Sequence, residues 1–149
     1  MNHIIVDLDG TLADNSHRQY LIESGGKKNW RAFFDACDKD TPVSALIKLL
    51  VTLYTPNASR LSIHILSGRS ETVRQKTIDW LAANFPYPHT LTMRSVNDFR
   101  DDWVVKGEMA ETLGLSPSNT LCVFDDRKSV VEMWRSKGFL CLQVADHDF

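Results

Sequence analysis

The chain has 149 residues, the size of one domain, and its 43% hydrophobic and 24% charged residues are ordinary values for a globular protein. A formal net charge of −2 excludes a broad basic surface that coats nucleic acid, and no apolar run reaches the roughly 18 residues of a membrane-spanning helix. A strand expected from residue 3 leaves no room for a signal peptide, and three cysteines without metal-type spacing favour reduced thiols in a cytoplasmic protein.

Apolar runs and helix signals alternate along the chain, with short connections. The expected strands are 3–7, 61–66, 89–93, 119–124 and 139–144, and the expected helices are 43–55, 70–84, 103–114 and 127–137. This alternation predicts an α/β fold, in which helices cover both faces of one Rossmann-like parallel sheet. We expect a single domain over residues 1–149, with its ligand beyond the carboxyl ends of the strands.

The first expected strand ends in two carboxylates. Asp7 and Asp9 stand two positions apart, so they share one face of the strand, and the Gly10-Thr11 turn follows at once. With no basic neighbour in the sequence the two acids repel each other, unless a cation or a proton transfer uses them. Asp9-Gly10 alone would indicate a simple turn, but Asp7 and Thr11 beside it favour a functional site.

Residues 14–40 show no regular pattern, and we expect an irregular segment that forms a small cap. The segment carries the aromatic side chains Trp30, Phe33 and Phe34. These rings could stack on a base, although the cap's own core is the favoured interpretation. A Gly-Gly-Lys-Lys run at 25–28 follows no strand and lacks the spacing of a nucleotide-binding P-loop.

Ser67-Gly68-Arg69 stands between the second long strand and the helix expected from residue 70. A hydroxyl and backbone N–H groups near a helix N-terminus form a natural anion site, and Arg69 adds a planar donor fork suited to phosphate oxygens. An N-cap followed by a turn is the simpler alternative.

Lys106 and the pair Asp125-Asp126 are the remaining polar signals. Lys106 is either a solvated lysine, an ordinary helical ion pair with Asp102 four residues before it, or an anion clamp. Asp125 and Asp126 end an apolar strand and suit a hard cation such as Mg²⁺. One of them could cap the following helix, but a cap needs only one acid.

In chain order, the segments Asp7-x-Asp9-Gly10-Thr11, Ser67, Lys106 and Asp125-Asp126 resemble the motifs of haloacid dehalogenase-like phosphohydrolases. Within that superfamily, Ser67-Gly68-Arg69, Asp102-x-Val104-Val105-Lys106 and the tail from Asp125 to Phe149 resemble the phosphatase domain of phage-type polynucleotide kinase-phosphatases. Arg18 also falls where that family places a functional arginine. The likeness weakens between residues 20 and 60, and Gly107 after the lysine is a minor departure.

The resemblance implies a Mg²⁺-dependent phosphatase. Asp7 would attack phosphorus and form an aspartyl-phosphate, and Asp9 would give a proton to the leaving alkoxide and then take one from water. The resemblance also implies the remaining roles. The expected metal ligands are Asp7, Asp125 and the backbone carbonyl of Asp9; the expected phosphate and substrate contacts are Thr11, Arg18, Ser67, Gly68, Arg69 and Lys106; Asp102 orients basic groups, and Asp126 acts through water or Lys106.

The expected substrate is a 3′-phosphate on a DNA or RNA end, or a nucleoside 3′-phosphate. A general nucleotidase or small-molecule phosphomonoesterase is the alternative, and a non-catalytic binding module is disfavoured because the acids and the lysine are intact. The resemblance includes no kinase module, so we expect cooperation with a separate kinase or ligase, and no membrane partner. DNA or RNA preference and oligomeric state stay open.

Overall fold

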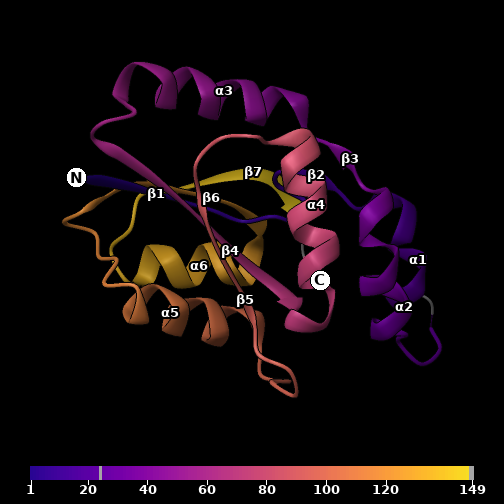
Figure 1. Ribbon diagram of the computed structural model, residues 1–149. Helices are drawn as coiled ribbons and strands as arrows, with labels where there is room; N and C mark the ends of the chain where they lie inside the picture. The colour runs from indigo at the N-terminus through magenta and orange to yellow at the C-terminus, as the bar shows by residue number, and fades with distance from the viewer. Residues whose placement is uncertain (24, 148–149) are drawn as a thin grey trace.

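The computed structural model describes residues 1–23 and 25–147, and its framework is a five-stranded parallel sheet (Figure 1). The strands lie in the order β5-β4-β1-β6-β7, with bounds β1 (Asn2–Val6), β4 (Leu61–Ser70), β5 (Thr90–Arg94), β6 (Thr120–Arg127) and β7 (Cys141–His147). The chain builds outward from β1 on one side and then from β6 on the other. The strand order therefore reverses between β1 and β6, the place where such sheets bind ligands. The expected fold class is confirmed.

Four helices cover the two faces of this sheet. They are α3 (Ser44–Tyr54) and α4 (Arg74–Asn84) on one face, and α5 (Asp102–Thr112) and α6 (Lys128–Ser136) on the other (Figure 1). Short 3₁₀ turns are η1 (Ser16–Arg18), η2 (Ala36–Lys39), η3 (Thr55–Asn57) and η4 (Glu71–Val73). Among the described residues, no helix has the length and apolarity that crossing a membrane requires.

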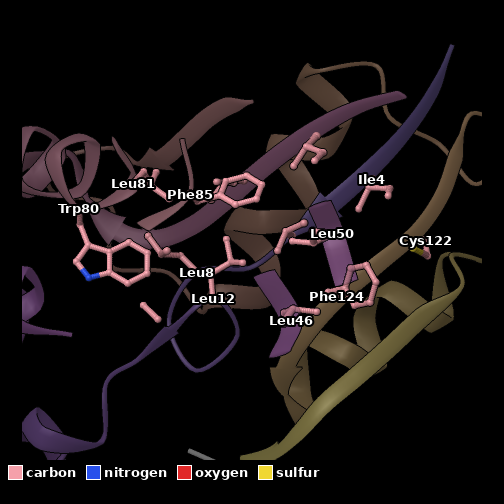
Figure 2. Close-up of a cluster of buried hydrophobic side chains, with 14 of the residues drawn as sticks. Ile4, Leu8, Leu12, Leu46, Leu50, Trp80, Leu81, Phe85, Cys122 and Phe124 are labelled. Atoms are coloured by element: carbon pink, nitrogen blue, oxygen red, sulfur yellow. The ribbon is translucent and has the colours of Figure 1, made fainter. Parts of the chain in front are cut away.

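The central strand β1 divides the core into two layers because alternate side chains point to opposite faces. Ile4 and Val6 join a cluster with α3 and α4, whereas Ile5 joins a second cluster with α5 and α6. Figure 2 shows the first cluster, where Leu50 and Phe85 pack against the sheet. Burial on both faces fixes β1, and with it the position of the acids that follow it.

The segment between β1 and α3 differs from the prediction. The structure shows α1 (Tyr20–Glu23), α2 (Trp30–Asp35) and a two-stranded antiparallel ribbon of β2 (Ala13–Asp14) and β3 (Thr41–Pro42), so the expectation of an irregular segment over 14–40 is wrong. Helices of four and six residues are too short to show a hydrophobic period in sequence. Tertiary contacts and the Asn29 cap, which accepts from Ala32 N at 3.1 Å, hold this helical lobe.

Two strands run further than expected at their carboxyl ends. β4 includes Ser67-Gly68-Arg69 and β6 includes Asp125-Asp126, with register shifts after Ser67 and Asp125 in the pairing to the outer strands. Ser70 caps the turn η4, and α4 begins only at Arg74. The predicted helix start at residue 70 is therefore wrong, and anion binding beside Ser67 stays a prediction. Residues 148–149 of the predicted tail motif lie outside the described residues.

Candidate active site

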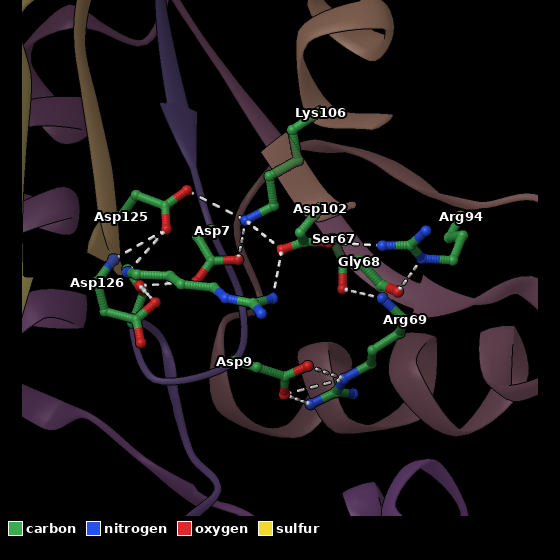
Figure 3. Close-up of polar contacts among 12 residues, drawn as sticks. Asp7, Asp9, Ser67, Gly68, Arg69, Arg94, Asp102, Lys106, Asp125 and Asp126 are labelled. Atoms are coloured by element: carbon green, nitrogen blue, oxygen red, sulfur yellow. Dashed lines mark hydrogen bonds and ion pairs between the residues drawn. The ribbon is translucent and has the colours of Figure 1, made fainter. Parts of the chain in front are cut away.

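Three carboxylates meet where β1 and β6 end. Asp7 follows β1, and Asp125 and Asp126 lie near the end of β6, its parallel neighbour. All three are buried, and one oxygen atom from each lies within 4.8 Å of the others. Figure 3 shows the three side chains beside one another at this edge of the sheet. The predicted gathering of polar groups at the carboxyl ends of the strands is what the structure shows.

Lys106, from α5, reaches into the same cluster. Its Nζ donates to Asp7 Oδ1 at 2.6 Å and to Asp125 Oδ2 at 3.1 Å, whereas Asp102 lies 3.8 Å away (Figure 3). The side chain is 2% exposed. A buried ammonium whose shortest contacts are to the acid cluster is neither a solvated lysine nor an ordinary helical ion pair.

The electrostatics of the cluster favour a cation. Burial raises the pKa of Asp7 well above its usual range and that of Asp125 to about 7. Burial alone would lower the pKa of Lys106, but the carboxylates of Asp125 and Asp7 raise it above its usual value, so the ammonium stays charged. Ionised together, the three carboxylates would outnumber this one ammonium, so a bound cation favours their ionised forms, and oxygen ligands of this kind suit Mg²⁺. The side chains of Asp7, Asp125 and Asp126 thus fit this metal.

Asp9 lies outside this cluster and faces two arginines. Arg69 binds its carboxylate with Nε at 3.1 Å and NH2 at 2.7 Å (Figure 3). Arg18 NH2 also donates to Asp9 Oδ1. Burial acts to raise the pKa of Asp9, but Arg69 and Arg18 together lower it below its usual value. Each of the two acids after β1 therefore has its own basic partner, Lys106 for Asp7 and the arginines for Asp9, a pairing the sequence did not reveal.

Arg18 and Arg69 are themselves fully buried and share a second carboxylate, Asp40. Arg18 binds Asp40 with Nε at 2.8 Å and NH2 at 2.7 Å, and Arg69 NH2 lies 3.0 Å from Asp40 Oδ2. Two arginines and two aspartates thus form a compensated network. It joins the helical lobe, which carries Arg18 and Asp40, to β4 and to the turn after β1.

The Gly10-Thr11 turn serves the acid cluster directly. Gly10 has φ of +80°, and a Cβ atom there would stand 2.1 Å from Asp126 Oδ2, so only glycine fits. The Thr11 hydroxyl lies 2.9 Å from Asp7 Oδ2 and 3.2 Å from Asp126 Oδ1. The turn interpretation and the functional interpretation of this motif therefore describe the same residues.

The Ser67-Gly68 segment packs against Asp102. A Cβ atom on Gly68 would stand 2.0 Å from Asp102 Oδ1, which explains the glycine. Ser67 is buried, and its Oγ accepts from the backbone N–H of Arg69 at 3.1 Å. Asp102 in turn binds Arg94 at 2.9 Å, with Arg127 at 3.8 Å. Asp102 thus contacts basic groups on three sides of the site, counting Lys106.

A cavity of about 350 Å³ opens over these residues. The predicted site residues that line it are Asp7, Asp9, Gly68, Asp102, Lys106, Asp125 and Asp126. The others, Thr11, Arg18, Ser67 and Arg69, are buried behind this lining. In this structure the two arginines hold Asp9, and their direct contact with substrate stays a prediction.

Asp40, Arg94, Arg127 and His147 contact the site but were not predicted as site residues. Arg94 binds the Gly68 carbonyl at 2.9 Å, and His147 Nδ1 contacts Asp126 Oδ2. Arg94 ends β5 at the same sheet edge as the other signals, so the strand-end argument would have found it. Asp40 had no signal in the sequence, because the burial of the two arginines that it binds is seen only in the structure. His147 had no signal, since the strand was expected to end at residue 144.

These features define a class of protein. An acid pair after the first strand, a buried lysine and a strand-end acid pair on a Rossmann-like sheet are the arrangement of haloacid dehalogenase-like phosphohydrolases. A solved protein of that family from Streptococcus pneumoniae has the same fold, with a TM-score of 0.63 at 17% identity over 96% of this chain and 84% of that one.

The particular family follows from the whole sequence. The model of the polynucleotide kinase PNKP phosphatase domain matches residues 1–149, so the chain belongs to this family of phosphoric monoester hydrolases. A chain from the Pnkp1/Rnl/Hen1 complex has a TM-score of 0.79 at 28% identity, over 99% of the present chain and 47% of its own length. A chain from a structure of the Pnkp1/Rnl/Hen1 RNA repair complex gives 0.77 at 28% identity, over 99% and 43%. The predicted resemblance is confirmed.

A viral relative matches a similar stretch. It comes from Autographa californica nuclear polyhedrosis virus, is named as a bifunctional polynucleotide kinase/RNA ligase, and is 28% identical over 134 residues, which are 89% of this chain and 17% of the viral protein. The present chain thus spans less than half the length of the viral protein and of the Pnkp1/Rnl/Hen1 chains.

Proposed function

We propose that the chain is a Mg²⁺-dependent phosphatase that uses Asp7 as nucleophile and removes 3′-phosphate from nucleic-acid ends or nucleoside 3′-phosphates. The observation that carries the proposal is the pairing of Asp7 with Lys106 beside Asp125, at the floor of the cavity. A buried carboxylate beside a buried ammonium gives one group to attack phosphorus and another to hold the phosphoryl oxygens.

In the first step an Asp7 oxygen bonds to phosphorus while the bond from phosphorus to the 3′ oxygen breaks, which leaves an aspartyl-phosphate and an alkoxide. Lys106 stabilises the charge on the phosphoryl oxygens, and the Thr11 hydroxyl, 2.9 Å from Asp7 Oδ2, orients the nucleophile. Mg²⁺ would be held by the side chains of Asp7, Asp125 and Asp126, and it would supply positive charge between the attacking carboxylate and the phosphate dianion. Water then releases inorganic phosphate and restores Asp7.

Asp9 carries the proton in both steps. It protonates the leaving alkoxide and then accepts a proton from the attacking water. Arg69 and Arg18 lower the pKa of Asp9, so the free enzyme holds it ionised. A phosphate dianion next to Asp9 raises the pKa of that carboxyl, because the negative charge disfavours its ionised form. We therefore propose that substrate binding itself prepares Asp9 as the acid.

Metal binding is expected to depend on pH. The pKa of Asp125, raised to about 7 by burial, means that the folded metal-free protein binds a proton there which the unfolded chain releases near pH 4. Its contribution to the free energy of unfolding is therefore complete below about pH 4 and is lost as pH rises through about 7, by on the order of 2–4 kcal/mol. Mg²⁺, which needs the ionised carboxylate, should stabilise the protein more at about pH 8 than at about pH 5.5.

Urea unfolding with chelator or with Mg²⁺, across this pH range, measures both effects. Asp125→Asn is the matched variant, because it keeps the shape of the side chain and cannot titrate. It should remove the contribution of Asp125 to the metal-free pH profile, so that stability falls less between about pH 4 and pH 7, and it should remove most of the stabilisation by Mg²⁺. Equal Mg²⁺ stabilisation of wild type and variant at every pH would contradict the assigned metal site.

Substrate position is tested with two RNA oligonucleotides of one sequence, phosphorylated at the 3′ or at the 5′ end. We expect kcat/KM for phosphate release to be at least about tenfold higher for the 3′ isomer, because moving the phosphate reverses the placement of sugar and base around it. Equal values, or a preference for the 5′ isomer, would favour the general nucleotidase instead. The cavity volume of about 350 Å³ suits a small ligand, which is the observation that favours a general nucleotidase as the second candidate function.

A kinase or a ligase is the kind of enzyme that we propose as the functional partner. Chains similar to this one come from a Pnkp1/Rnl/Hen1 RNA repair complex, and the viral relative is named as a kinase/RNA ligase. We propose that this chain prepares RNA ends for a kinase or ligase, since a 3′-phosphate must be removed before a 3′-hydroxyl can be joined. The lobe over residues 14–40 is proposed as the cap over the active site.

A further inference from the structure

Two groups of aromatic side chains line the cavity from different parts of the chain. One is Trp30 with Phe33 and Phe34 on α2, and the other is Phe99 in the loop 95–101 between β5 and α5 (Figure 1). Phe99 is 89% exposed and Trp30 is 41% exposed. The mechanism above uses neither ring. Large apolar rings left in solvent beside a phosphate site indicate a ligand surface.

The Trp30 ring is packed against other rings, and the backbone that carries Phe99 is held by hydrogen bonds on both sides. Trp30 packs on Phe34 at 5.9 Å between ring centroids and edge-on against Phe33 at 5.6 Å. The residues on either side of Phe99 are fixed by Arg94, whose NH1 donates to the carbonyls of Asp98 at 3.1 Å and Arg100 at 2.7 Å. A braced loop presents its ring with little loss of freedom on binding.

The same arginine connects the loop to the catalytic floor. Arg94 also binds the Gly68 carbonyl at 2.9 Å and Asp102 at 2.9 Å, and both of those residues line the cavity (Figure 3). The backbone on either side of Phe99 is therefore tied to the site where the phosphate would react. A cavity of about 350 Å³ lies at the lower end of the roughly 300–1,000 Å³ of small-ligand sites, so it suits one nucleotide rather than a duplex.

We infer that Trp30 and Phe99 form an aromatic clamp for the unpaired base of the terminal nucleotide whose phosphate is removed. The inference rests on the proposed function and adds the part of the substrate that is recognised. Stacking accepts every base because each has a π face, so the clamp selects for a nucleobase without reading its identity. Lys28, whose Nζ lies 5.6 Å from the Trp30 ring centre, adds positive charge beside this wall of the cavity.

The test compares two 3′-phosphorylated oligonucleotides that differ only in their last residue, one with a base and one abasic. Wild type should favour the base-bearing substrate in kcat/KM by roughly 5-fold to 150-fold, and Phe99→Ala and Trp30→Ala should each reduce that ratio, mainly through KM. Phe99→Trp should keep the ratio, because it keeps a stacking face. Leu140→Ala, at an apolar side chain 62% exposed before β7, is the matched control and should leave both substrates unaffected.

The outcomes distinguish failure of the aromatic clamp from failure of the proposed phosphatase activity. Equal kcat/KM for the two substrates in wild type, or an unchanged ratio in Phe99→Ala, overturns the clamp and leaves the phosphatase standing. Hydrolysis of neither substrate overturns the phosphatase and the clamp with it. Equal ratios for the four bases, within about threefold, support stacking; a strong preference for one base overturns it in favour of hydrogen-bond readout.

Discussion

Phosphate release from a 3′-phosphorylated oligonucleotide is expected to fall by at least about 10³-fold when Asp7 is replaced by asparagine. The amide occupies the same space but offers no anionic oxygen to attack phosphorus, so the reaction loses its covalent step. Release of inorganic phosphate under saturating Mg²⁺ is the measurement. Asp79→Asn, on the exposed surface of α4, is the matched control and should retain wild-type activity.

Folding of the Asp7→Asn protein separates chemistry from structure. Burial raises the pKa of Asp7, so its charge is held at a cost, and Lys106 keeps Asp125 as a partner when that charge is removed. The metal-free variant should therefore be at least as stable as wild type by urea unfolding. An active Asp7→Asn enzyme would refute the nucleophile; an inactive but unfolded one would show that the carboxylate is structural.

Asp40→Asn is expected to destabilise the protein by about 3–5 kcal/mol, the usual result when one member of a buried charge network is removed. Arg18 and Arg69 are fully buried and would share the charge of Asp9 alone. Asparagine preserves the backbone carbonyl that accepts from Trp80 Nε1 at 2.7 Å, so this bond is not what is lost. Urea unfolding, followed by tryptophan fluorescence, measures the change.

Asp38→Asn is the control from the same segment. Asp38 is exposed and lies 3.8 Å from Lys39, a surface pair worth at most about 1 kcal/mol. Its replacement should shift the unfolding free energy by less than about 0.5 kcal/mol. If Asp40→Asn were equally mild, the two arginines would be compensated by another route, and the network would not anchor the lobe.

Strand periodicity and strand-end chemistry were enough to predict the sheet and its acid cluster. Asp7 and Asp125 were expected at one edge because parallel strands bring their carboxyl ends together. The helices and the two-stranded ribbon of the lobe were not predicted. Its helices are short and depend on Arg18 and Asp40, 22 residues apart, so no local pattern reports them.

The partners of the acids were less visible than the acids. The sequence has no cation next to Asp7 or Asp9, and it indicated mutual repulsion, but folding brings Lys106 from 99 residues away to Asp7 and Arg69 from 60 residues away to Asp9. The reach of the strands was also underestimated. β7 continues to His147, and this extension is what brings an imidazole to Asp126.

The four-membered charge network has a mechanical consequence. Arg18 lies near the start of the lobe, and Asp40 is its last residue. Arg18 forms an ion pair with Asp9, which follows β1, and Asp40 forms one with Arg69 in β4. Moving the lobe away from the sheet would separate these buried opposite charges, which costs far more free energy than bending an exposed loop. We therefore expect the lobe to stay in place during turnover. Substrate should enter the cavity between α2 and the loop 95–101 without a movement of the lobe.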